Sequence, residues 1–138
     1  MKPLTSEEAA VIPLRTDSDI QKRVEQLIGR ANVRQLWLLF LDDLDTQLPL
    51  LIPIGGLPPY PLDGQTADVL DHVREVMGDV GASSIVVVHE RYASSTLSGP
   101  DIAWAQSLRE GCAGTGITLR AQLLSHRSGV RWIADDDL

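Results

Sequence analysis

Side chains that can bind a metal or stabilise a negative charge lie close together near the middle of the chain. His89 ends an apolar, β-branched run, and Ser98 and Asp101 follow it with the spacing Ser-x-x-Asp. Imidazole and carboxylate are common ligands of divalent cations, and a serine hydroxyl can donate to an oxyanion. Arg91 follows His89 by two positions, and its guanidinium stays protonated and has no lone pair for a metal. The stretch therefore offers two potential metal ligands beside a residue that cannot be one.

The same residues also have structural interpretations. Ser98 and Asp101 have the spacing of a capping box, in which the serine accepts from the first free amides of a helix and the carboxylate reaches back. His89 at the end of an apolar strand is typical of a hydrogen-bonded core histidine. Arg91 and Asp101 can form an ion pair. We hypothesise that this ion pair substitutes for a metal.

A different metal could be held by His89, Asp101 and either Glu90 or His126, because imidazole and carboxylate together suit several divalent ions. His89 and Glu90 are neighbours in an extended strand, so their side chains point to opposite faces and make a poor chelate. We therefore expect no metal, with His89 and Asp101 as the ligands if there is one.

Hydrophobic spacing predicts the elements that position these residues. Helices are predicted over residues 18–29, 64–80 and 98–113, and strands over 35–41, 48–54, 84–88, 117–124 and 130–133. We expect strand 35–41 to be central, and strand 48–54 to be irregular or at an edge because Pro49 and Pro53 cannot donate to a ladder. The last two strands form a predicted β-hairpin. Residues 1–17 are a lead-in that docks or stays mobile, and residues 135–138 form an acidic, solvated tail.

This order of elements, together with the residues around His89, resembles the RadC branch of the JAB/MPN (JAMM) superfamily. The segment from Gly81 through His89, then Ser98-x-x-Asp101, corresponds to a family line of His-x-His-Pro-Ser-Gly followed by Pro-Ser-x-x-Asp. The resemblance covers residues 20–134. It implies an α/β (α+β) fold: a single three-layer domain with a mixed central sheet, flanked by helices and ending in a β-hairpin.

The resemblance also implies roles for individual residues. In the family, a His-x-His pair and an Asp hold a catalytic zinc, a Glu from an earlier strand acts as general base, and the Ser assists the oxyanion. His89, Ser98 and Asp101 match three of these positions. Arg91 occupies the position of the second His, and Gln35 lies nearest to that of the Glu, where an amide cannot accept a proton.

Two further departures fall on the same region. Ala121 and Gln122 align with an Asp-His pair of related chains, and Tyr92, Ala93 and Ser94 replace the Pro-Ser-Gly. We therefore expect no catalytic residue and no cofactor, but a vestigial pocket. The residues assigned to it are His89, Arg91, Ser98, Asp101 and Gln35.

The function implied is that of a non-catalytic RadC-like JAB domain that binds a protein partner or a second copy of itself, as a scaffold or regulatory module. The loop of Tyr92 and residues 94–97 is the first place to look for a bound ligand or peptide. The alternative is a metal-dependent, isopeptidase-like hydrolase with altered zinc ligands.

Composition narrows the classes of partner. The 138 residues carry a formal charge of −7, and the basic residues form no stripe, which argues against nucleic-acid binding. The apolar runs are too short for a membrane span, and no leader pattern precedes them, so we expect a cytoplasmic protein. Cys112 is expected to be a buried small hydrophobe.

Overall fold

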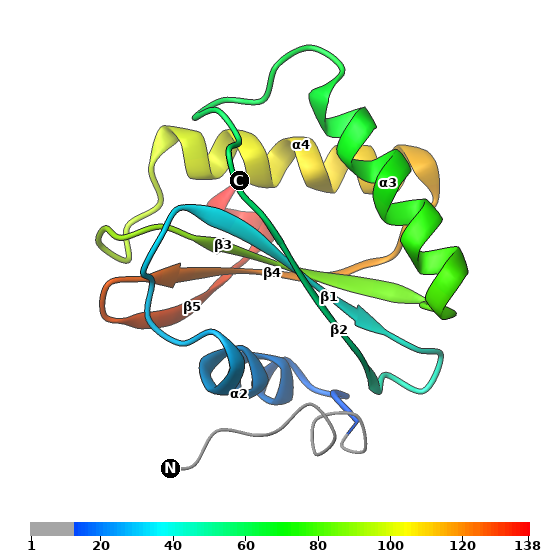
Figure 1. Cartoon of the computed structure of the whole chain (residues 1–138). Helices are drawn as coiled ribbons and strands as arrows, with labels where there is room; N and C mark the ends of the chain where they lie inside the picture. The colour runs from blue at the N-terminus through cyan, green and yellow to red at the C-terminus, as the bar shows by residue number, and fades with distance from the viewer. Residues whose placement is uncertain (1–12) are drawn as a thin grey trace.

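The computed structural model describes residues 13–138, which form one five-stranded sheet with helices on both faces (Figure 1). The strands lie in the order β2-β1-β3-β4-β5. Their bounds are β1 Gln35–Leu41, β2 Gln47–Ile54, β3 Ser84–Glu90, β4 Leu119–His126 and β5 Gly129–Ile133. The helices are α2 Asp17–Leu27, α3 Gln65–Val80, α4 Gly99–Thr115 and the short 3-10 helix η1 Asp135–Asp137. None of the helices in this part of the chain is long and apolar enough to cross a membrane.

The sheet is mixed because two kinds of connection build it. Strand β1 pairs antiparallel with both β2 and β3, and β4 pairs antiparallel with β5 across a tight turn. Strands β3 and β4 are parallel, which requires the crossover that α4 supplies. Helices α3 and α4 cover one face and α2 covers the other (Figure 1). The expected three-layer α/β domain with a mixed sheet and a final β-hairpin is confirmed.

Strand β3 lies at the centre of the sheet, and all seven of its residues are buried. A strand covered on both faces needs an unbroken apolar run, and Ile85 through Val88 supplies one. Alternate residues contribute to different cores: Ile85 and Val87 pack under α3 and α4, whereas Val86 and Val88 pack over α2. The central strand therefore carries its last two side chains, His89 and Glu90, into different layers.

The strand order and the helix ends differ in part from those predicted from the sequence. The edge position of β2 is confirmed, whereas β1, which we expected at the centre, is the second strand and β3 takes that place. Helix α2 begins one residue early, because Thr16 accepts from the amide of Asp19 at 3.1 Å and forms a capping box with it. Helix α4 runs two residues longer than predicted, to Thr115, before Gly116 ends it at a φ of 75°.

The two ends of the described chain dock on the domain. Of the lead-in, Pro13 bridges to Thr46 and Leu14 is buried, while residues 1–12 lie outside the described part. The acidic tail is only partly solvated: Asp135 and Asp136 are exposed, but the carboxylate of Asp137 accepts from Arg131 at 2.9 Å. The expectation of a purely solvated tail was wrong at Asp137, because the neighbouring strand offers a guanidinium.

Candidate functional site

His89 reaches towards α4 and is held by Gln122 of the neighbouring parallel strand. The Nε2 atom of His89 lies 2.7 Å from Oε1 of Gln122, and Nε2 of Gln122 donates to the carbonyl of Ala105 in α4 at 2.9 Å. Since the amide nitrogen is committed to Ala105, the amide oxygen must face the imidazole, and Nε2 of His89 is the donor. Burial lowers the pKa of His89, so the ring is neutral with its free lone pair on Nδ1.

Arg91 and Asp101 form a bidentate ion pair beside His89. Nε of Arg91 donates to both carboxylate oxygens at 3.0 and 3.2 Å, and a terminal nitrogen donates to Oδ2 at 2.9 Å. The two side chains are only 14% and 8% exposed, so water screens the pair weakly. The hypothesised pair is therefore present.

Ser98 completes the arrangement around Asp101. Its amide and its hydroxyl both donate to Oδ2 at 2.8 Å, and the serine oxygen caps α4, as the spacing predicted. Burial alone would raise the pKa of Asp101, but the hydrogen bonds from Arg91 and Ser98 hold that pKa below its usual value. The carboxylate is consequently ionised, and its lone pairs are directed at an arginine and a serine.

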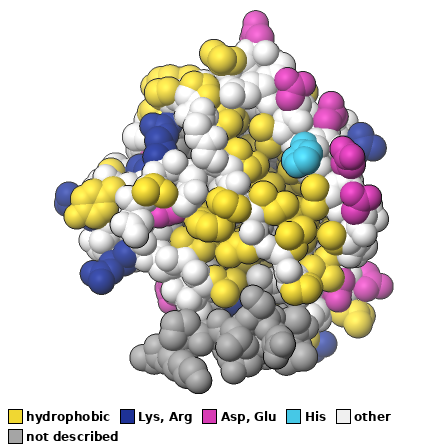
Figure 2. Space-filling model, viewed as in Figure 1, with side chains coloured by type: hydrophobic (Ala, Val, Ile, Leu, Met, Phe, Trp, Pro, Cys, Tyr) yellow, Lys and Arg dark blue, Asp and Glu magenta, His cyan; other side chains and the backbone are white. Residues whose placement is uncertain are grey.

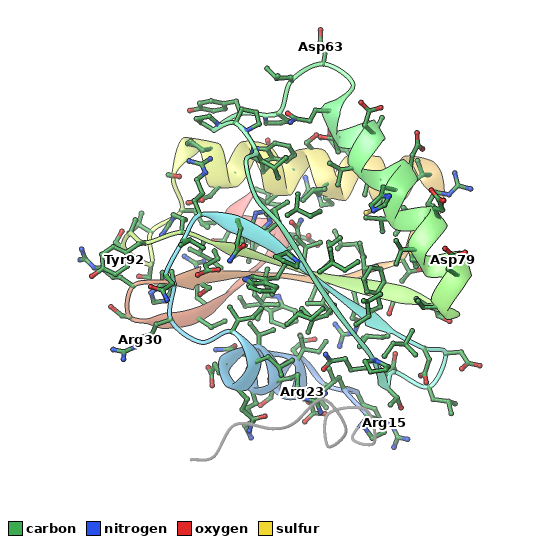
Figure 3. All side chains as sticks on the ribbon, in the orientation of Figure 1. Arg15, Arg23, Arg30, Asp63, Asp79 and Tyr92 are labelled. Atoms are coloured by element: carbon green, nitrogen blue, oxygen red, sulfur yellow. The ribbon has the colours of Figure 1, made fainter. Side chains whose placement is uncertain are left out.

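The two terminal guanidinium nitrogens of Arg91 also organise the loop that leads into α4. They donate to the carbonyls of Ser94 at 2.6 Å and Thr96 at 2.8 Å. The loop is thus folded around the arginine, and Tyr92 points away from the body of the molecule with 73% of its surface exposed (Figure 3). We expected a ligand surface at Tyr92 and residues 94–97. Two carbonyls of this loop, those of Ser94 and Thr96, point inward to Arg91.

Glu90 lies on the opposite face of the sheet from His89 and accepts four hydrogen bonds. The donors are the backbone amides of Asn32 at 2.6 Å and Val33 at 3.1 Å, the Gln35 amide at 2.9 Å and the Trp37 indole at 2.8 Å. Burial would raise the pKa of Glu90, but these bonds together hold it below its usual value. Gln35, at the expected place of a general base, instead donates to a structural carboxylate.

A small cavity of about 40 Å³ opens between these groups. That volume holds a few water molecules and no peptide segment. His89, Arg91, Asp101 and Gln35 all line it, and Ser98 contacts it through Asp101. Four of the five predicted pocket residues thus line the cavity, whereas Ser98 lies behind Asp101 and the side-chain amide of Gln35 is turned to Glu90. The rest of the lining is Arg34, Leu36, Leu57, Glu90, Pro100 and Trp104.

The donor set at this cavity does not fit a catalytic zinc. Only His89 and Asp101 could serve as ligands, and both oxygens of Asp101 already accept from Arg91. The alternative ligands are committed: the carboxylate of Glu90 accepts its hydrogen bonds on the opposite face of the sheet, and Nδ1 of His126 accepts from the amide of Ser128 at 3.2 Å. Within residues 13–138, no three His, Cys, Asp or Glu side chains are gathered as a metal would require.

Other reactive candidates are accounted for by packing. Cys112 is buried in α4, and burial raises the pKa of its thiol to about 11, so it is not a ready nucleophile. Trp104 is buried and donates to the carbonyl of Pro58 at 2.8 Å. Trp104 forms part of the wall of the cavity, and Cys112 belongs to the hydrophobic core.

Sequence reasoning missed two partners in this site. Gln122 was noted only as a departure from Asp-His, although a polar residue in a buried strand is itself a signal that a partner exists. The role of Trp37 as a donor to Glu90 had no sequence signal, because their contact depends on the pairing of β1 with β3.

Comparison with known proteins adds no identification. No protein-family model matches the chain, and no curated protein sequence matches it.

Proposed function

We propose that this chain is a non-catalytic domain of the RadC-like JAB/MPN type that acts by binding another protein. One observation carries the proposal: the guanidinium of Arg91, at the position that the resemblance assigns to a metal-binding histidine, bonds both oxygens of Asp101. A residue that cannot bind a metal thus occupies the one carboxylate that could.

The chemistry around the cavity supports a non-catalytic role. Hydrolysis of an amide needs a group that activates water, and Gln35 has no basic atom for that purpose. Both oxygens of Glu90 are engaged by hydrogen-bond donors on the other face of the sheet. The imidazole of His89 is buried and hydrogen-bonded to Gln122.

The same contacts support a binding role. Removal of a metal from an ancestral site would leave Asp101 as an uncompensated buried charge, which costs several kcal/mol. Arg91 removes that cost and fixes the loop before α4 through the carbonyls of Ser94 and Thr96. A domain that keeps its shape without a metal can serve as a scaffold.

Zinc content after dialysis tests the proposal. The purified full chain is loaded with zinc, dialysed and analysed for metal beside the variants Arg91→His and Arg91→Lys. We expect no stoichiometric zinc in the natural chain or in the matched Arg91→Lys control. We expect zinc to be retained by Arg91→His, because the substitution adds an imidazole and releases Asp101.

Two results would contradict the proposal. One zinc per natural chain, lost in His89→Ala, would favour the metal-dependent hydrolase. No zinc in Arg91→His, with its fold intact, would mean that position 91 does not correspond to a ligand position, and the JAB assignment would fail.

A further inference from the structure

An apolar surface lies where the edge strand β2 meets α3. It consists of Leu50, Ile52 and Ile54 of β2 and Val69, Val76 and Met77 of α3, all half-buried and packed on the same core cluster. We call these six residues the β2–α3 face. Figure 2 shows hydrophobic side chains gathered over this part of the molecule, with other atoms between some of them. Apolar surface gathered in this way marks an interaction site.

Acidic side chains border the β2–α3 face along α3. Asp68, Asp71, Glu75 and Asp79 are exposed there, and the helix also carries the exposed His72 and Arg74. Figure 2 shows the acidic groups along the margin beside the hydrophobic surface, and Figure 3 places Asp79 near the end of α3. The border is therefore negative, in keeping with the charge of −7 on the whole chain. A complementary partner carries Lys and Arg around an apolar centre.

The edge of β2 is poorly suited to accept another strand. Pro49 and Pro53 are exposed and have no amide hydrogen to donate, so a ladder along this edge lacks donors at both positions. A helix satisfies its own backbone hydrogen bonds and contacts the face through side chains alone. A helical partner segment therefore suits the face better than an extended one.

A second copy of the chain is a poor occupant. In a two-fold contact the same patch packs on itself, so the acidic borders of both copies would come together. Like charges at an interface oppose association, and this chain has few basic residues in α3 to offset them.

We propose that the β2–α3 face binds an amphipathic helix of a protein partner whose apolar side is flanked by Lys and Arg. This inference rests on the proposed function of the domain as a binding module. It locates the interaction on the β2 side of the sheet and not at the loop around Arg91.

The test uses the full chain and a labelled helical peptide made of leucine and lysine, with a leucine–glutamate peptide of the same pattern as control. We expect saturable binding of the lysine peptide by fluorescence anisotropy, and amide shifts in two-dimensional NMR confined to β2 and α3. Asp71→Lys combined with Glu75→Lys should weaken binding about tenfold or more, because the exposed border reverses sign.

The matched control is Glu110→Lys combined with Asp136→Lys, which reverses two exposed acidic residues away from the face and should leave binding unchanged. Equal binding of the glutamate peptide, shifts elsewhere, or a stable homodimer with protected β2 and α3 amides would overturn the proposal. Zinc retention by the natural chain would overturn the non-catalytic role alone. Absence of peptide binding in a zinc-free chain would overturn only the helical partner.

Discussion

At the scale of single residues, the contacts of Arg91 make its positive charge costly to remove. Arg91→Ala leaves the carboxylate of Asp101 buried with only Ser98 as a partner. We expect the free energy of unfolding to fall by about 3 kcal/mol, as for other buried pairs that lose one member. Urea denaturation with circular dichroism measures it.

The control for this prediction removes the charge of Asp101. In an Asp101→Asn background, Arg91→Ala leaves no buried carboxylate without its partner, so it should cost clearly less than in the natural chain. An equal loss in both backgrounds, or none in either, would show that the ion pair does not stabilise the domain.

Whether a contact of the site could be predicted depends on how many residues separate its two members in the sequence. The Ser98–Asp101 cap and the Arg91–Asp101 pair could be predicted because few residues separate their members. The His89–Gln122 hydrogen bond could not, because it depends on the register of β3 against β4. That register includes an irregularity between Ile85 and Val86. Spacing in sequence does not encode such a shift.

At the scale of elements, two glycines of α4 differ in what surrounds them. A Cβ on Gly114 would meet no atom within 4 Å, whereas one on Gly111 would lie 2.5 Å from Cδ1 of the buried Leu70 in α3. We expect Gly114→Ala to raise the free energy of unfolding by about 0.5–1 kcal/mol through helix propensity. Gly111→Ala should lower it, because Leu70 has to move.

Chemical denaturation of these two variants checks the packing of α3 on α4, and each serves as the control for the other. Equal stabilisation by both substitutions would mean that the helices are not in close contact at Gly111. The locations of the helices were predictable from apolar spacing and caps. The close approach of α3 and α4 could not be predicted, because a glycine within a helix does not indicate which residue packs against it.

The order of the strands shows the same limit. The run 35–41 predicted a strand buried on both faces, and β1 is an interior strand. Strand β3 is central because it pairs with β1 on one side and, through the crossover helix α4, with the parallel β4 on the other. A crossover of this length allows β4 to pair with more than one strand, so the sequence does not determine the order.

At the scale of the whole molecule, the buried titratable groups predict sensitivity to acid. Burial lowers the pKa of His89 in the folded state below its ordinary value of 6.5, which the unfolded state keeps. Between the folded and the unfolded pKa the unfolded state binds more protons, so the free energy of unfolding falls as the pH falls. The lowered pKa values of Glu90 and Asp101 add losses below their reference values of 4.5 and 3.8. Each group contributes at most about 1.4 kcal/mol per pH unit.

Urea denaturation across this pH range measures the effect. In His89→Gln we expect a shallower decline between about pH 6.5 and 5, with a residual slope because burial also lowers the pKa of His126. The exposed His72→Gln is the matched control for loss of a histidine. Stability that rises on acidification would contradict the assigned directions.

The segment between α2 and β1 has no regular secondary structure, yet it is tied to strands far along the chain. The amide of Ala31 donates to the carbonyl of His126, and those of Asn32 and Val33 donate to Glu90. These three amides can therefore exchange with solvent only when their contacts with the ends of β3 and β4 break. A segment that resembles a surface loop in sequence thus belongs to the cooperative folding unit of the central sheet.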